Sequence, residues 1–225
     1  KNLPGLDLLA DELAAAGHGL IMVMGKGGVG KTTIAAALAL GLVQRGKTVH
    51  LSTTDPAAHL AGTLMGEVPG LKVSRIDPKV ETQRYIDKIM AAKSPKLDAA
   101  EQALLLEDLK SPCTEEVAVF HALSRIVSEG RSAFVVLDTA PTGHSMLLMD
   151  ATGAYHRQMT REFEGHGPSH IVTPLMRLQD AAYTKIILVT LPELTPVSQA
   201  ASLQEDLSRA SIEPYAWVLD KSVLA

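Results

Sequence analysis

The most informative segment of this sequence is Gly25-Lys26-Gly27-Gly28-Val29-Gly30-Lys31-Thr32-Thr33, which directly follows the apolar run Leu20–Met24. It has the form G-x-x-x-x-G-K-[ST], in which glycines let backbone N–H groups curl around a triphosphate. In this pattern Lys31 reaches the β- and γ-phosphates and Thr32 offers its hydroxyl to Mg²⁺. The apolar run predicts a strand, and Ile34–Leu40 predicts a helix whose positive N-terminus points at the anion. The sequence therefore predicts a nucleotide site that uses every position of the loop: Gly25, Lys26, Gly27, Gly28, Val29, Gly30, Lys31, Thr32 and Thr33.

Lys26 makes this loop more specific than a general phosphate loop. A second lysine places more positive charge on the loop than one bound triphosphate needs from a single chain. We interpret it as a charge held for use across an interface, with an ordinary solvated surface lysine as the alternative.

Composition narrows the class of protein. The chain has 225 residues, 46% of them hydrophobic, which suits one large α/β domain. The formal net charge is −4 and no basic stripe is present, so nucleic acid is not an expected partner. The apolar runs are too short to span a bilayer and no signal segment opens the chain, which predicts a cytoplasmic protein. Lys1 in place of Met suggests a piece of a longer chain or a processed product.

Short β-branched runs alternate with helical patterns, which is typical of a mostly parallel twisted sheet with helices on both faces. We expect a P-loop NTPase fold of the α/β class over residues 1–225. A charge-rich pair of helices at about 80–110 is not needed for the sheet and is interpreted as a helical insertion. The predicted strands are Leu20–Met24, Thr48–Ser52, Lys72–Ile76, Ala133–Leu137, Lys185–Thr190 and Tyr215–Leu219.

Two aspartates follow predicted strands at the edge of the sheet where α/β folds bind ligands. Asp55 follows the second strand and is placed to orient an attacking water or to reach the Mg²⁺ shell. It also suits the N-cap of a helix that begins at Pro56, and the two roles are compatible. Asp138 follows the apolar run Ala133–Leu137 and has the form of the second carboxylate of a phosphate-loop enzyme, which holds Mg²⁺. A plain strand end with a Pro-Gly turn is its alternative.

The only cysteine lies in Ser111-Pro112-Cys113-Thr114-Glu115-Glu116. Ser111 suits an N-cap and Pro112 the first helical position, so Cys113 falls in a first turn, where the helix dipole favours thiolate. A thiolate there is a good soft ligand, although a lone cysteine is more often a small buried hydrophobe. His144 ends the switch-like segment Asp138–His144 and would move with the nucleotide state.

These segments together resemble the arsenical pump-driving ATPases, a family of deviant phosphate-loop ATPases. Asp55-Pro56-Ala57-Ala58-His59-Leu60 and Asp138-Thr139-Ala140-Pro141-Thr142-Gly143-His144 narrow the resemblance to the arsenical-pump and protein-targeting branch, and the segment around Cys113 narrows it to the pump. The likeness is greatest to the second half of the duplicated pump chains. It implies half of a pseudo-dimer that lacks its last helical region.

The resemblance implies a metalloid-stimulated ATPase that uses ATP and Mg²⁺ and takes As(III) or Sb(III) as activator and substrate. Lys26 and Lys31 would act on the phosphates, Lys26 from across the interface, and Asp55 would position water. Thr32, Asp55 and Asp138 would hold Mg²⁺, and Cys113, His144 and Ser111 would bind the metalloid. The family commonly has an adenine-contacting Asn where this chain has Asp220.

The implied partners are a homologous half or a second copy, an integral membrane arsenite channel and a metallochaperone. The protein would lie at the inner membrane when bound to the channel. A different reading is an ATP-dependent targeting chaperone for tail-anchored membrane proteins, although this chain lacks that branch's Cys-x-x-Cys clasp and Met-rich groove. A third is a nucleotide-dependent scaffold with little hydrolysis, and the lack of an Asn-Lys-x-Asp motif disfavours a GTPase.

Overall fold

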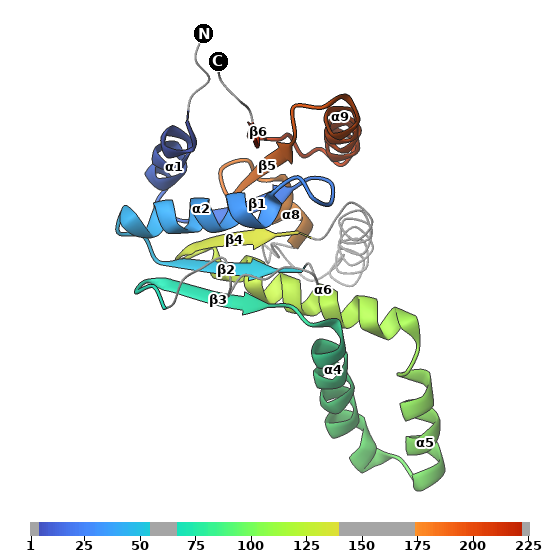
Figure 1. Cartoon of the computed structure of the whole chain (residues 1–225). Coiled ribbons are helices and arrows are strands. Elements are labelled where there is room, and N and C mark those ends of the chain that lie inside the picture. The colour runs from blue at the N-terminus through green and yellow to red at the C-terminus, as the bar shows by residue number, and fades with distance from the viewer. Residues whose placement is uncertain (1–4, 55–66, 140–173, 222–225) are drawn as a thin grey trace, which may run out of the picture. The chain divides into compact units, whose positions relative to one another are not determined.

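A computed structural model describes residues 5–54, 67–139 and 174–221 (Figure 1). The chain divides into two compact units. Unit 1 contains residues 1–75 and 126–225, and unit 2 contains residues 76–125.

Unit 1 contains a six-stranded sheet in the order β3-β2-β4-β1-β5-β6. Every pairing between neighbouring strands is parallel. From β1 the chain reaches β2 and β3 on one side of the sheet, and β5 and β6 lie on the other, so the order reverses near β1. Such a reversal marks the ligand-binding edge of α/β sheets. The strands are β1 (Gly19–Met24), β2 (Val49–Thr53), β3 (Leu71–Arg75), β4 (Phe134–Asp138), β5 (Thr184–Thr190) and β6 (Ala216–Leu219).

All six strands predicted from the sequence are present, with boundaries that differ by one residue at most ends. The inner strands β1, β2, β4 and β5 are buried almost throughout, which explains their continuous apolar runs. The predicted α/β class with a mostly parallel sheet is therefore confirmed.

Helices α1 (Leu6–Ala15) and α2 (Lys31–Gln44) pack together on one face of this sheet. Helix α2 is buried over much of its surface because small alanines alternate with Leu38 and Leu42 along it. It ends where Gly46 adopts a left-handed φ of 73°, at the stop that the sequence predicted. Its core partners on the strands point to the same face: Ile21, Val23, Val49, Leu51, Phe134, Val136, Ile187 and Val189.

Helices α6 (Pro112–Glu129), α8 (Pro174–Gln179) and α9 (Leu194–Arg209) also contribute to the described part of unit 1. Helix α6 begins in unit 2 and its last residues, from Ile126, belong to unit 1. Helices α8 and α9 both contact β5. Glu129 at the end of α6 contacts His50, which alternates along β2 with the core residue Leu51. The end of α6 therefore lies on the face of the sheet opposite α2.

Unit 2 consists of α4 (Pro78–Lys93), a short 3₁₀ turn η1 (Ser94–Lys96), α5 (Ala99–Asp108) and most of α6. Helices α4 and α5 lie where the sequence predicted the insertion. Asp77 caps α4 by accepting from the N–H groups of Lys79 and Val80, and Asp98 and Glu101 form a capping box on α5. None of the helices in the described ranges is long and apolar enough to cross a membrane.

Candidate nucleotide-binding site

The phosphate loop (residues 25–33) runs from the carboxyl end of β1 into the first turn of α2, which begins at Lys31. Gly25 has a φ of 152°, and a Cβ atom there would come within 2.3 Å of the Val189 carbonyl oxygen. Gly30 is the N-cap of α2 with a φ of 90°. Both positions therefore require glycine, one for close approach to β5 and one for left-handed backbone. The backbone N–H groups of the loop and the positive N-terminus of the 14-residue helix α2 therefore lie together, as in an anion-binding site.

The two lysines of the loop differ in exposure. The Lys31 side chain is folded into the loop, with Nζ donating to the Lys26 carbonyl oxygen at 2.9 Å, and the residue is only 5% exposed. Lys26 itself is exposed to solvent. A lysine held in this way places its charge inside the loop, whereas Lys26 is available to another molecule.

Asp138, the last residue of β4, is fully buried. Its Oδ2 atom accepts hydrogen bonds from the Thr32 hydroxyl at 2.8 Å and from the Thr53 hydroxyl at 3.1 Å. The structure therefore brings together Thr32 and Asp138, which the sequence had placed in one metal site. Thr53 was not among the predicted site residues. Strand pairing shows its position, and the sequence alone does not state which strands are neighbours.

The donor set at this point suits Mg²⁺. A buried carboxylate and a threonine hydroxyl are hard oxygen ligands, and the loop beside them supplies space and N–H groups for phosphate oxygens, with which Mg²⁺ shares its coordination. A buried carboxylate needs hydrogen bonds or a cation to offset its desolvation. The residues present thus fit the ion that the sequence predicted.

The structure describes only some of the predicted site residues. Asp55 and His144 are outside the described residues, and so is the side chain of Cys113. Helix α6 does begin at Pro112, as predicted, and the exposed Ser111 hydroxyl lies 3.1 Å from that of Thr114. No group of three or more His, Cys, Asp or Glu side chains gathers within residues 5–54, 67–139 and 174–221. The metalloid site therefore stays a prediction.

Asp220 lies close to the phosphate loop. A Cβ atom on Gly30 would come within 2.2 Å of the Asp220 Oδ2 atom, so this carboxylate stands directly beside the N-cap of α2. The Asp220 N–H donates to the Thr190 carbonyl oxygen at 2.9 Å, and its Oδ1 accepts from the Lys221 N–H. These contacts place a candidate nucleotide-contacting residue next to the loop. A contact of Asp220 with adenine stays a prediction.

A second polar group that sequence reasoning missed lies on the opposite face of β2. We call it the His50 cluster; it contains His50, Ser52, Lys72, Ser74 and Glu129. His50 is 5% exposed, its Nδ1 is 2.6 Å from Glu129 Oε2, and its Nε2 is 2.7 Å from Ser74 Oγ. The Ser74 hydroxyl also lies 3.0 Å from that of Ser52, and Lys72 reaches Glu129 at 3.5 Å.

Burial lowers the pKa of His50, and the hydrogen bond and charge of Glu129 offset this only in part. Burial therefore favours the neutral imidazole, whose two ring nitrogens contact the Glu129 carboxylate and the Ser74 hydroxyl. The cluster ties the end of α6 to β2 and β3. Its side chains bond to one another across these elements, which indicates a structural role.

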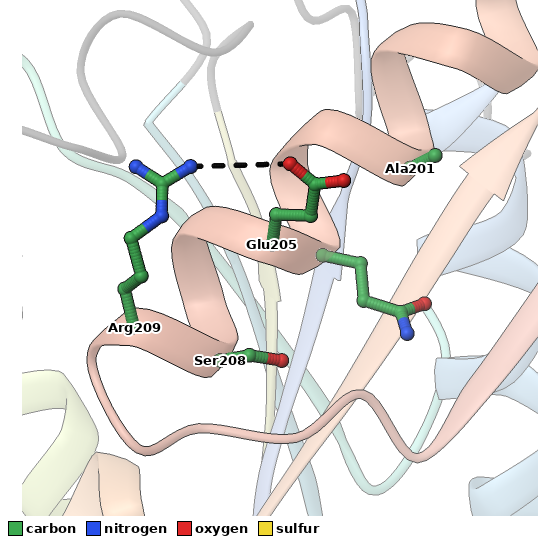
Figure 2. A pocket seen from close by; sticks show the side chains of 5 residues that line it. Ala201, Glu205, Ser208 and Arg209 are labelled. Atoms are coloured by element: carbon green, nitrogen blue, oxygen red, sulfur yellow. Dashed lines mark ion pairs between the residues drawn. The ribbon is translucent and has the colours of Figure 1, made fainter.

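The pocket drawn in Figure 2 shares no lining residue with the phosphate loop. It is lined by residues of α9 alone: Ala201, Gln204, Glu205, Ser208 and Arg209. Arg209 and Glu205 form an ion pair at 4.0 Å, and both side chains are largely exposed. An exposed pair of this kind contributes little to binding or stability.

The sheet is parallel, and its first strand leads into a glycine loop. Lys31 and Thr32 open the next helix, and Thr32 is hydrogen-bonded to a buried aspartate at the end of another strand. These features together define the P-loop NTPase class. The model of the anion-transporting ATPase family matches residues 18–179, and the chain belongs to this family.

The similar proteins carry consistent names. An arsenical pump-driving ATPase of Escherichia coli is 56% identical over 218 residues, which cover 97% of this chain and 37% of that protein. One from Acidiphilium multivorum is 56% identical over 223 residues, covering 99% of this chain and 38% of that protein. A more distant relative, the ATPase get3 of Pyrenophora tritici-repentis, is 23% identical over 89% of this chain. The chain thus spans less than two fifths of the length of its nearer relatives.

Proposed function

We propose that this chain is one ATP-hydrolysing half of a metalloid-stimulated ATPase that energises arsenite or antimonite efflux through a membrane channel protein. The observation that carries the proposal is the assembled site at Thr32 and Asp138, in a chain that is 56% identical over almost its whole length to arsenical pump-driving ATPases. Hydrolysis would break the bond between the γ-phosphorus and the bridging oxygen while water forms the new bond, giving ADP and phosphate.

The loop and its neighbours would bind the nucleotide. Backbone N–H groups of residues 25–33 would receive the phosphates, Lys31 would place its charge at the β- and γ-phosphates, and Thr33 would contribute from the first turn of α2. Thr32 and Asp138 would hold Mg²⁺. The bound ion would neutralise charge that develops on the phosphate oxygens. The position of Asp220 beside Gly30 supports a contact with the nucleotide, and adenine is our proposed partner for it.

Two residues would make hydrolysis depend on assembly. Asp55 would orient the attacking water and contact the Mg²⁺ shell. Lys26 would reach the nucleotide of a facing homologous half or second copy, and its solvent exposure supports this role. A charge supplied across an interface makes the rate depend on closure of that interface.

The metalloid would favour closure. Cys113, with Ser111 and His144, would supply ligands to As(III) or Sb(III), and the facing half would supply the remaining thiolates because this chain has one cysteine. A ligand that requires both halves binds only the closed state, so it shifts the population toward the hydrolysing form. A metallochaperone would deliver the metalloid, and the channel would hold the complex at the inner membrane.

The alternative function is a targeting chaperone for tail-anchored membrane proteins. The distant similarity to the ATPase get3 is compatible with it, but the single cysteine cannot form the Cys-x-x-Cys clasp of that branch. The pump reading is therefore preferred.

The deciding experiment is ATPase rate against antimonite concentration in the full-length protein and in Cys113→Ser. We expect antimonite to raise the wild-type rate severalfold, and the serine variant to keep its basal rate while losing most of the stimulation. A flat response in the wild type would favour the chaperone. Equal stimulation of both proteins would remove Cys113 from the metalloid site but leave the ATPase assignment intact.

A further inference from the structure

Strand β2 ends in a threonine, Thr53, whose side chain is directed at the buried carboxylate of Asp138. Strands β2 and β4 are parallel, and their register pairs Thr53 with Asp138. Val49 and Leu51 on β2, and Phe134 and Val136 on β4, all belong to the core beneath α2. Because side chains alternate along a strand, Thr53 and Asp138 lie on that same face.

Two hydroxyls therefore meet at one carboxylate oxygen. Thr32 donates to Asp138 Oδ2 from the start of α2, and Thr53 donates to it from the end of β2. A backbone bond reinforces the same junction, because the Thr54 N–H donates to the Asp138 carbonyl oxygen at 2.9 Å. Asp138 is thus held by side chain and by main chain at the end of β2.

Burial increases the importance of the hydrogen bond between Thr53 and Asp138. Thr53 is 1% exposed and Asp138 is fully buried, so water does not replace a lost hydroxyl easily. A hydrogen bond to a buried carboxylate is charge-assisted and fixes the orientation of both oxygens. Hydrogen-bonded neighbours of metal ligands commonly control metal affinity without contacting the metal themselves.

We propose that Thr53 is a positioning residue that orients the Asp138 carboxylate for Mg²⁺. The inference rests on the proposed nucleotide function but not on the metalloid role. Thr53 touches neither substrate nor metal. It acts by holding the Asp138 carboxylate, through its Oδ2 atom, in one orientation at the end of β2.

The test compares Thr53→Val with Thr53→Ser in the full-length protein. Valine keeps the branched shape and removes the hydroxyl, whereas serine keeps the hydroxyl. Thr184→Val is a matched control: Thr184 is also a buried threonine in a strand, but its hydroxyl donates to the Arg177 carbonyl oxygen at the other end of the sheet. Binding of a fluorescent ATP analogue is measured in EDTA and against Mg²⁺ concentration, together with the Mg²⁺ dependence of hydrolysis.

We expect Thr53→Val to raise the Mg²⁺ concentration for the half-maximal change in analogue binding about tenfold or more. Its affinity for the analogue in EDTA should match the wild type, and Thr53→Ser and Thr184→Val should behave as the wild type. A purely structural role would lower thermal stability without moving the Mg²⁺ midpoint, and that result would overturn the proposal. So would an equal shift in the serine variant.

Two further measurements keep the outcome decisive. If Thr53→Val does not fold, Thr53→Ala removes the same hydroxyl with less bulk and must show the same Mg²⁺ shift for the proposal to stand. A wild-type protein whose analogue binding ignores Mg²⁺ would overturn the inference and the Mg²⁺ assignment together. A protein that binds Mg²⁺ and ATP but ignores antimonite would refute only the metalloid part of the proposed function.

Discussion

The two faces of strand β2 place polar side chains in opposite kinds of environment. On the face toward α2, Thr53 joins Thr32 at the Asp138 carboxylate, at the ligand-binding end of the sheet. On the other face, His50 joins Glu129 and Ser74. Each group is built around a buried polar side chain of the same five-residue strand.

The two groups differ in the charges and partners that surround their carboxylates. The Asp138 group brings a negative charge, two hydroxyls and a helix N-terminus to one place, a combination that attracts Mg²⁺ and phosphate. In the His50 cluster the carboxylate is matched by an imidazole and by Lys72, so the interactions are complete without a ligand. A buried carboxylate beside a nucleotide motif therefore indicates a binding site, whereas a carboxylate that contacts an imidazole and a lysine away from such a motif indicates a structural role.

The largest effect is expected from Lys31→Ala, which removes the charge that α2 directs into the phosphate loop. Hydrolysis should fall by at least about a hundredfold, because the loss of one preorganised electrostatic contact costs about that much or more. The measurement is the ATPase rate at saturating Mg²⁺ and ATP. Lys79→Ala, an exposed lysine of unit 2, is the control. Undiminished turnover in Lys31→Ala would show that ATP is not hydrolysed at the phosphate loop.

A smaller effect is expected from His50→Leu, on the opposite face of β2. The change leaves Glu129 without the imidazole and should lower the free energy of unfolding by about 1–3 kcal/mol. Chemical denaturation measures this value. The Mg²⁺ midpoint for nucleotide binding should remain that of the wild type, in contrast to Thr53→Val. A shifted midpoint would mean that the two faces of β2 are coupled.

The smallest effect is a pH dependence that arises from His50. Burial lowers the pKa of His50 below its ordinary 6.5 in the folded protein, so below about pH 6.5 the unfolded chain binds a proton that the folded chain does not. Stability should therefore fall as the pH decreases from about 7.5 to 5.5. The decrease should be smaller in His50→Asn, in which this group does not titrate. Identical decreases would show that His50 is as easily protonated in the folded protein as in the unfolded chain.

Much of the fold could be predicted from the sequence because its signals are local. The strands of the sheet are short runs of β-branched and apolar residues. The end of α2 follows from Gly46, and the start of α6 follows from Ser111-Pro112. The phosphate loop was equally clear, since its glycines and Lys31 lie in one continuous motif. The pairing of Thr32 with Asp138 was predicted by motif type, although 106 residues separate them.

Thr53 and the His50 cluster could not be predicted in the same way. Thr53 precedes the candidate Asp55 by two positions, and nothing in its neighbourhood distinguishes it from Thr54. His50 interrupts an otherwise ordinary strand, and its partner Glu129 lies 79 residues away. Both roles depend on which strand lies next to β2 and in what register, which a single sequence does not state.

The sequence by itself determined the nucleotide motif, the α/β class and the residues that carry charge near phosphate, because each depends on residues that are neighbours in the chain. Tertiary structure alone decided that β4 lies beside β2, so that Thr53 faces Asp138 while His50, three residues earlier, faces Glu129. The physical reason is the two-residue period of a strand. It sends alternate side chains to opposite faces, and only the packed sheet determines what each face meets.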